Sequence, residues 1–159
     1  MNFARDLGAL IMCIGLCFAV AAIGSAVTMP AIGTWYASLN KPAWNPPGWV
    51  FGPVWSVLYL SMGVSVWLVW RKAGFSGGSV ALSLFAVQLA LNCIWSGLFF
   101  GLRQPWLAFG EIILLSCAIL ATIISFARVS PLASILLVPY LVWVTFAAAL
   151  NFTIARMNP

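Results

Sequence analysis

Amides and indoles are the polar groups that this chain places where chemistry could occur. In the segment 79–100, Gln88, Asn92 and Trp95 recur at helical spacing and share one helix face. In the segment 132–155, Tyr140 and Trp143 do the same. These groups give directional hydrogen bonds, but none is a strong acid or base. They favour recognition of an apolar ligand in a cavity, although the same amides could instead bond neighbouring helices as packing contacts.

The groups that most enzymes use for catalysis are scarce. The sequence has no histidine and only two acidic side chains, Asp6 and Glu111. A histidine-based triad and a His-ligated metal are therefore excluded, and a pair of catalytic carboxylates is disfavoured. The four cysteines all fall in apolar segments, where packing is their usual role. We expect no catalytic residue, no metal site and no required cofactor.

The composition is that of an integral, multi-pass membrane protein. Hydrophobic residues make up 64% of the chain, charged residues 6%, and the mean hydropathy is +1.10, whereas a soluble domain has about a quarter charged residues. About 20 apolar residues span a bilayer, and the charge-free runs predict five transmembrane helices: 7–27, 49–70, 79–100, 106–127 and 132–155. We expect an all-α fold with one five-helix domain over residues 1–159. The net charge of +5 is spread between the helix ends, so nucleic-acid binding is not expected.

The first apolar run has a second interpretation. Arg5, the apolar stretch and the small residues Gly24-Ser25-Ala26 resemble a secretory signal peptide. The run from Leu7 to Val27 is longer than a usual signal-peptide core, which favours a transmembrane helix.

The connection between the first two helices is rich in rigid residues. The stretch 35–55 holds four of the nine tryptophans and four of the nine prolines. Proline restricts the backbone, and tryptophan supplies a broad apolar face with one N–H. We expect a preorganised lid over a binding site, formed by Trp35, Trp44, Pro46, Pro47 and Trp49.

Two features of the helices predict either a cavity or close helix contacts. Pro139 should kink the fifth helix, and the alanines 147–149 leave open volume beside the kink or allow close packing. On the third helix, small residues recur four apart in Ala86-Val-Gln-Leu-Ala90 and Gly97-Leu-Phe-Phe-Gly101. Ala86, Ala90, Gly97 and Gly101 could pack within the bundle or form a homodimer face.

Four ordered motifs resemble the TspO/MBR family of tryptophan-rich sensory proteins and translocator proteins. They are Leu39-Asn-Lys-Pro-Ala-Trp-Asn-Pro-Pro-Gly-Trp-Val-Phe in the first loop, Pro53-Val-Trp55 at the second helix, Gln88-Leu-Ala-Leu-Asn92-Cys-Ile-Trp95 in the third, and Val138-Pro-Tyr-Leu-Val-Trp143 with Phe146-Ala-Ala-Ala-Leu-Asn151 in the fifth. The resemblance covers nearly the whole chain.

The resemblance implies a function in binding tetrapyrroles. Family members bind porphyrins such as protoporphyrin IX, and isoquinoline carboxamide and benzodiazepine-type compounds, commonly as homodimers. By motif, the pocket would be lined by Trp55, Asn92, Trp95, Trp143, Ala147 and Leu150. The chain would sense, sequester or translocate porphyrin. Tight sterol binding is doubtful, because Phe152 stands where the family's sterol motif has tyrosine.

Two alternatives remain open from the sequence. One is an enzyme that degrades porphyrin with light and oxygen, which would need no acid or base. The other is a transporter of small lipophiles, for which proton coupling normally needs an intramembrane carboxylate. Glu111 is the one candidate, and its place near a helix start favours an interfacial position instead. The sequence does not distinguish an inner from an outer membrane.

Overall fold

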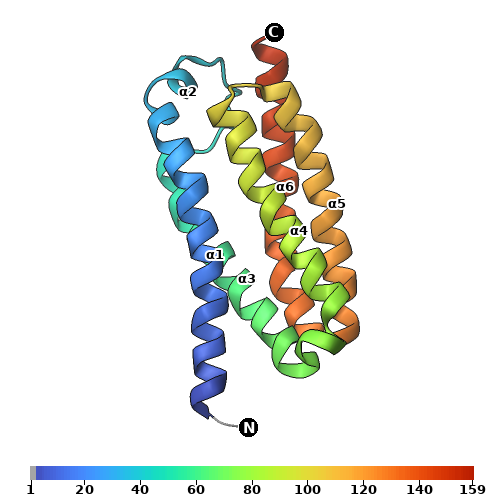
Figure 1. Cartoon of the computed structure of the whole chain (residues 1–159). Coiled ribbons are helices and arrows are strands. Elements are labelled where there is room, and N and C mark those ends of the chain that lie inside the picture. Colours follow the sequence, from blue (N-terminus) through green and yellow to red (C-terminus); the bar gives the residue numbers. More distant parts are fainter. Residues whose placement is uncertain (1–2) are drawn as a thin grey trace.

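The computed structural model describes residues 3–159, and these residues are almost entirely helical (Figure 1). The long helices are α1 (Phe3–Ile32), α3 (Gly48–Gly77), α4 (Ser79–Ser96), α5 (Pro105–Val129) and α6 (Pro131–Met157). A short helix, α2 (Trp35–Ser38), lies in the first loop, and a π-helical turn, η1 (Gly97–Gly101), continues α4. With η1 included, all five long segments are long and apolar enough to cross a membrane. The predicted five-helix, all-α membrane fold is confirmed.

The helix ends follow local sequence signals. Pro105 and Pro131 occupy the first turns of α5 and α6, where the missing N–H of proline has no partner to lose. Before α6, the Ser130 hydroxyl accepts a hydrogen bond from the Ala133 N–H. Near the end of α3, Gly74 adopts a φ of +66°, a left-handed conformation that glycine reaches without steric cost. The helices extend a few residues beyond the predicted charge-free runs, because interfacial residues continue the helical turns.

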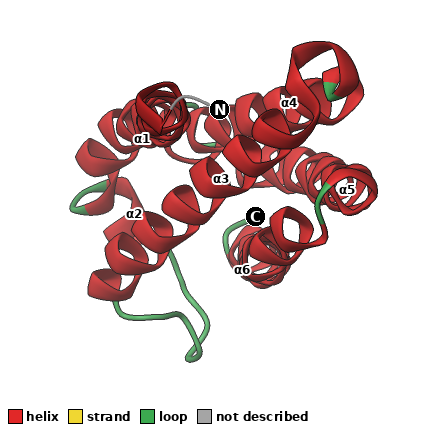
Figure 2. Cartoon of the chain, turned by 90° about the horizontal axis from the view of Figure 1, so that it is seen from below, coloured by secondary structure: helices red, strands yellow, loops and turns green. Residues whose placement is uncertain are grey.

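The five long helices form a ring that does not follow the order of the chain (Figure 2). Going round it, α1 packs against α3, α3 against α6, α6 against α5, α5 against α4, and α4 against α1. The short turns after α4 and α5 make α4, α5 and α6 an antiparallel series. The first loop, the start of α5 and the end of α6 therefore lie at one end of the bundle, opposite the N-terminus (Figure 1).

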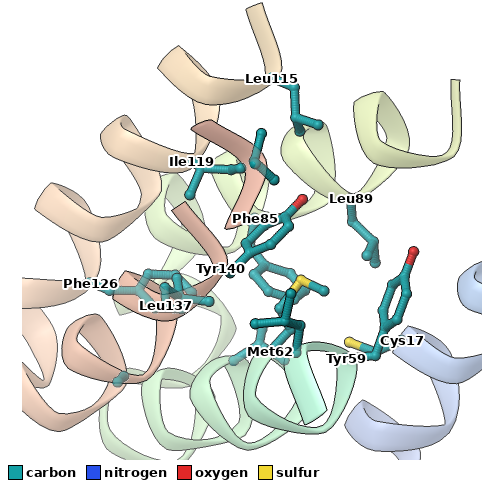
Figure 3. Close-up of a cluster of buried hydrophobic side chains, with 14 of the residues drawn as sticks. Cys17, Tyr59, Met62, Phe85, Leu89, Leu115, Ile119, Phe126, Leu137 and Tyr140 are labelled. Atoms are coloured by element: carbon teal, nitrogen blue, oxygen red, sulfur yellow. The ribbon is translucent and has the colours of Figure 1, made fainter. Parts of the chain in front are cut away.

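The ring is filled by an apolar core that contains two buried tyrosines. Cys17, Met62 and Ile119 are fully buried and come from α1, α3 and α5. Tyr59 of α3 and Tyr140 of α6 lie among these side chains (Figure 3). A phenol buried in lipid or in an apolar core needs a hydrogen-bond partner, so the tyrosines mark where polar contacts inside the ring must occur.

One glycine sets the approach of α1 to α3. A Cβ placed on Gly63 would lie 2.7 Å from the Cα of Ile14, closer than real Cβ atoms come to another backbone. Only glycine therefore fits this crossing. Without a hydrophobic drive between helices in lipid, such close backbone contact is a main source of packing energy.

Two backbone features concern the segments next to the first loop. In η1 the Leu102 N–H donates to the Gly97 carbonyl over 2.8 Å, five residues back, which widens the turn. This π-helical turn, a feature often found at functional sites, could not be predicted from the sequence. In α6 the helix continues through Pro139, whose ring is exposed on the helix surface.

Candidate ligand site

An apolar groove separates α3 from α6 in the half of the bundle next to the first loop. Its volume is about 780 Å³, within the range of roughly 300–1,000 Å³ typical of small-molecule sites. It is lined by Pro53, Val54, Val57, Leu58, Val138, Pro139, Val142, Trp143 and Phe146. Three of the lining side chains, Val57, Val138 and Val142, are exposed, so the groove lies at the surface of the bundle.

The sequence of α3 and α6 explains where the groove lies. Farther from the first loop, the two helices are joined by a hydrogen bond of 2.6 Å from the Ser65 hydroxyl to the Ala133 carbonyl. Nearer the loop, each helix presents a proline to the groove, Pro53 from α3 and Pro139 from α6. The compact proline ring fills less space than the leucine or phenylalanine common in these helices. Volume is thus left between the helices where the prolines face each other.

Trp143, which lines the groove, has a buried N–H without a partner. Its indole Nε1 is buried and has no hydrogen-bond partner among the described residues. The ring lies in an aromatic wall, 5.9 Å from Phe51 and 5.4 Å from Phe146 between centroids. Leaving a buried N–H unpaired costs about 1–3 kcal/mol. A ligand acceptor that reached this N–H would recover that energy.

A chain of hydrogen bonds crosses the interior of the ring. The Tyr59 hydroxyl donates to Oδ1 of Asn92 over 2.5 Å, and Nδ2 of Asn92 donates to the Tyr140 hydroxyl over 2.8 Å. All three side chains are buried. Trp55 lies against both tyrosines, with ring centroids 5.6 Å from Tyr59 and 6.3 Å from Tyr140. The Asn92 amide therefore joins α4 to α3 and α6. This agrees with the interpretation in which the buried amides bond neighbouring helices.

Trp95 is held by a second amide. Its indole N–H donates to Oδ1 of Asn151, and its ring stacks on Phe99 with centroids 5.2 Å apart. Leu150, next to Asn151, is buried in a small cluster with Phe99 beneath the first loop. Ala147 is half-buried, one helical turn from Trp143. Of the six residues predicted to line the pocket, Trp143 lines the groove itself.

The residues predicted to form the lid take different positions. Trp35 packs edge-on against Phe99, and Trp44 reaches Phe146 at the groove with centroids 5.8 Å apart. The Pro46 carbonyl accepts a hydrogen bond within the loop, and Pro47 directly precedes α3. Trp49 is 77% exposed in the first turn of α3. Trp44 is thus the loop tryptophan that contacts a residue of the groove wall.

The loop is fastened by polar residues that the sequence analysis did not single out. The Lys41 ammonium donates to the carbonyls of Tyr36 and Leu39 over 2.7 and 2.8 Å, and so caps the end of α2. The Tyr36 hydroxyl donates to Asn45 over 2.9 Å. Burial raises the pKa of the Tyr36 phenol and the bond to Asn45 lowers it, with burial the larger effect. The phenol therefore stays a neutral donor at neutral pH.

The end of α6 also holds the loop in place. The Asn158 side chain accepts from the Asn40 backbone N–H and donates to the Asn40 carbonyl, each over 2.9 Å. This paired contact joins residues 118 positions apart. The Asn158 amide thus bonds to both the backbone N–H and the backbone carbonyl of one loop residue. The contact between Asn158 and Asn40 could not be predicted from the sequence, because an asparagine near the end of a chain does not by itself indicate a partner.

Glu111, which the sequence predicted to lie near a membrane interface because it follows a helix start, is buried among the helices. Its side chain is 7% exposed, and neither carboxylate oxygen has a hydrogen-bond partner among residues 3–159. It follows Ala108 and precedes Ile112 and Leu115 on the buried face of α5. The sequence gives the distance of a residue from its helix end, but it does not give the direction in which the helix turns that residue.

The small residues of the third transmembrane segment divide between two surroundings. Ala86 and Ala90 are exposed on the outer face of α4, and Gly97 has nothing within 4 Å of a built Cβ. Gly101 lies against α1, since a Cβ there would be 3.1 Å from a methyl carbon of Val27. Gly101 therefore serves packing inside the bundle, while Ala86 and Ala90 remain free for a partner.

The ring of five apolar helices, with an aromatic groove beneath a fastened loop, defines a multi-pass membrane protein with an apolar groove between two of its helices. The model of the TspO/MBR family matches residues 13–157. The chain belongs to this family.

Its relatives span bacteria and animals. It is 48% identical to the tryptophan-rich protein TspO of Chlorobaculum tepidum, over 94% of this chain and 96% of that protein. It is also 48% identical to the human translocator protein, over 78% of this chain and 75% of that one. A tryptophan-rich sensory protein of Cereibacter sphaeroides is 38% identical, over 87% and 88% of the two chains.

Proposed function

We propose that this chain is a membrane receptor for porphyrins that senses, sequesters or translocates them, with the α3–α6 groove as the binding site. A sensory or translocator role agrees with the names of its relatives. The observation that carries the proposal is an apolar groove of about 780 Å³ whose wall includes Trp143, a residue with a buried, unpaired indole N–H. A porphyrin is a large, flat aromatic ligand, which suits a slot walled by indole and phenyl rings.

In this proposal the groove and the first loop contact different parts of the ligand. The apolar walls from α3 and α6 would hold the macrocycle, and Trp143 would donate a hydrogen bond to a ring nitrogen or a carboxylate. Trp44, which lies against Phe146, would cover the end of the ligand nearest the first loop. Lys41 is already bonded to backbone carbonyls, so its main role is to hold the loop. Isoquinoline carboxamides and benzodiazepines, with aromatic rings and carbonyl acceptors, fit the same chemistry.

The test is a titration of the purified protein with protoporphyrin IX in darkness, followed by quenching of tryptophan fluorescence. Wild type should saturate at one porphyrin per chain. Trp143→Phe keeps most of the ring and removes the N–H, so its affinity should fall about three- to tenfold, as expected for one hydrogen bond. Trp70→Phe is the matched control, because Trp70 lies toward the other end of α3, against Phe75. Its affinity should equal that of wild type.

The same sample separates binding from the two alternatives. Equal affinity in the Trp143→Phe and wild-type proteins would remove the groove from the proposal. Illumination in air distinguishes the enzyme, since loss of the porphyrin absorption band with a new product would show degradation. Accumulation of porphyrin inside sealed vesicles that contain the protein, above that in protein-free vesicles, would show transport.

A further inference from the structure

The Glu111 carboxyl occupies a position in which a negative charge has no compensation. The side chain is 7% exposed and neither oxygen accepts a hydrogen bond from residues 3–159. The one ion pair within that range joins Arg71 to Asp6, at the end of the bundle that holds the N-terminus. An ionised carboxylate removed from water without a cation or donors is so costly that such a group takes up a proton instead.

The interior hydrogen bonds end at a phenol on the helix beside that of Glu111. Tyr59 donates to Asn92, and Asn92 donates to the oxygen of Tyr140. The Tyr140 oxygen therefore acts as the acceptor in that bond, and its own proton remains to be donated. Tyr140 is fully buried on α6, which packs against α5, the helix that carries Glu111.

Gln88 adds a second buried acceptor to the interior of the ring. It lies one helical turn before Asn92 on α4, is 1% exposed, and its Oε1 has no partner among the described residues. Its Nε2 contacts the sulfur of Met62 on α3. The interior thus holds unpaired acceptors on both Gln88 and Glu111. A protonated Glu111 carboxyl has an O–H donor that the ionised carboxylate lacks.

We propose that Glu111 is an intramembrane proton-binding site that carries its proton at neutral pH. The buried polar side chains of the ring include the phenols of Tyr59 and Tyr140 on α3 and α6, the amides of Gln88 and Asn92 on α4, and the thiol of Cys17 on α1. All are neutral at neutral pH. Glu111 is thus the group inside the ring that gains or loses a charge when a proton enters or leaves. The proposal does not depend on the porphyrin site.

The composition of the chain makes a direct test possible. Infrared spectra of the protein in lipid bilayers show a C=O stretching band for each protonated carboxylic acid. Asp6, Glu111 and the C-terminus are the only carboxyl groups in the sequence. The exposed C-terminus ionises well below neutral pH, and Asp6 is paired with Arg71. We expect an acid band at pH 7 that disappears as the pH is raised.

The variants assign the band. Glu111→Gln, which keeps the size of the side chain, should abolish it, and Asp6→Asn should leave its intensity unchanged. Absence of the band in wild type at pH 7, or its survival in Glu111→Gln, would overturn the proposal. If Glu111→Gln does not fold, Asp6→Asn decides alone, since Glu111 is then the only side-chain carboxyl left.

Discussion

The indole N–H of Trp95 donates to the Oδ1 of Asn151 over 3.1 Å and so joins α4 to α6. The Nδ2 of Asn151 in turn donates to the Pro105 carbonyl over 2.8 Å, at the start of α5. One buried amide thus bonds three helices directly beneath the first loop. The carbonyls and N–H groups at a helix end need such partners when water is excluded. The Asn151 amide therefore supplies partners for the Trp95 N–H and the Pro105 carbonyl, which helix packing alone would leave unpaired.

We predict that Asn151→Ala destabilises the bundle by about 2–4 kcal/mol, because the Trp95 N–H and the Pro105 carbonyl both lose their partners. The measurement is the thermal unfolding midpoint in detergent by circular dichroism. Thr145→Ala is the control, since Thr145 is exposed on α6 and bonds only to its own helix. That variant should change stability by no more than about 0.5 kcal/mol. Equal midpoints for the two variants would contradict the role assigned to Asn151.

The contact between Asn158 and Asn40 predicts a change in ligand kinetics. Asn158→Ala removes both hydrogen bonds that hold Asn40 and should loosen the lid without touching the groove. Bound protoporphyrin should dissociate several-fold faster, while the unfolding midpoint stays close to that of wild type. Stopped-flow displacement measures the rate. Ser79→Ala, exposed at the opposite end of the bundle, is the control. An unchanged dissociation rate would show that the loop does not retain the ligand.

The prolines of the loop give a separate test of the lid. Pro46→Ala with Pro47→Ala adds backbone freedom where the loop enters α3, and each such change typically costs about 0.4–1 kcal/mol of preorganisation. The double variant should release porphyrin faster than wild type. If it folds and its dissociation rate is unchanged, the bonds from Lys41 and Asn158 are sufficient to order the loop and the prolines are not required.

The close crossing of α1 and α3 predicts that the stability of the protein depends on the absence of a side chain at Gly63. In Gly63→Ala the new methyl group meets the backbone of Ile14, which cannot move aside as a flexible side chain would. We expect a loss of about 1–3 kcal/mol, the usual cost of overpacking. Gly15→Ala on α1 is the matched control, because a Cβ there has nothing within 4 Å. Thermal midpoints of the two variants that agree would disprove the close approach.

The sequence predicts the helices of this protein well, because a bilayer demands long apolar runs and excludes charge from them. The runs 7–27 and 132–155 fall wholly within α1 and α6. The lateral arrangement is harder to predict, since every helix face that meets lipid is as apolar as one that meets another helix. Asn92 could be recognised as a buried amide, but its partners Tyr59 and Tyr140 depend on α6 lying beside α3.

The same limitation explains the contacts that could not be predicted. Glu111 lies six positions after Pro105, about 9 Å along the helix at 1.5 Å per residue, and that distance is compatible with an interfacial side chain. It does not tell that the rotation of α5 turns this side chain toward the other helices. Lys41 in the loop and Asn158 at the end of α6 bond to backbone groups, which every residue carries, so no pairing of residue types signals their contacts.

We propose that the exposed small-residue face of α4 forms a homodimer, with Ala86 and Ala90 in direct contact with a second copy. Both alanines are exposed, so leucine at each position can be accommodated by the isolated bundle. Ala86→Leu with Ala90→Leu should therefore fold but run as a monomer in light scattering in detergent, whereas wild type should run as a dimer. Gly101 is unsuitable for this test, because it packs against Val27 within the bundle.

The matched control for the dimer is Ala19→Leu with Ala22→Leu, which adds the same bulk to an exposed face of α1. This variant should remain a dimer, since it leaves α4 unchanged. In lipid the association of helices depends on close packing between small residues, so two leucines on the contact face remove most of that contact. A dimer that persists in the α4 variant and is lost in the α1 variant would place the interface on α1 instead.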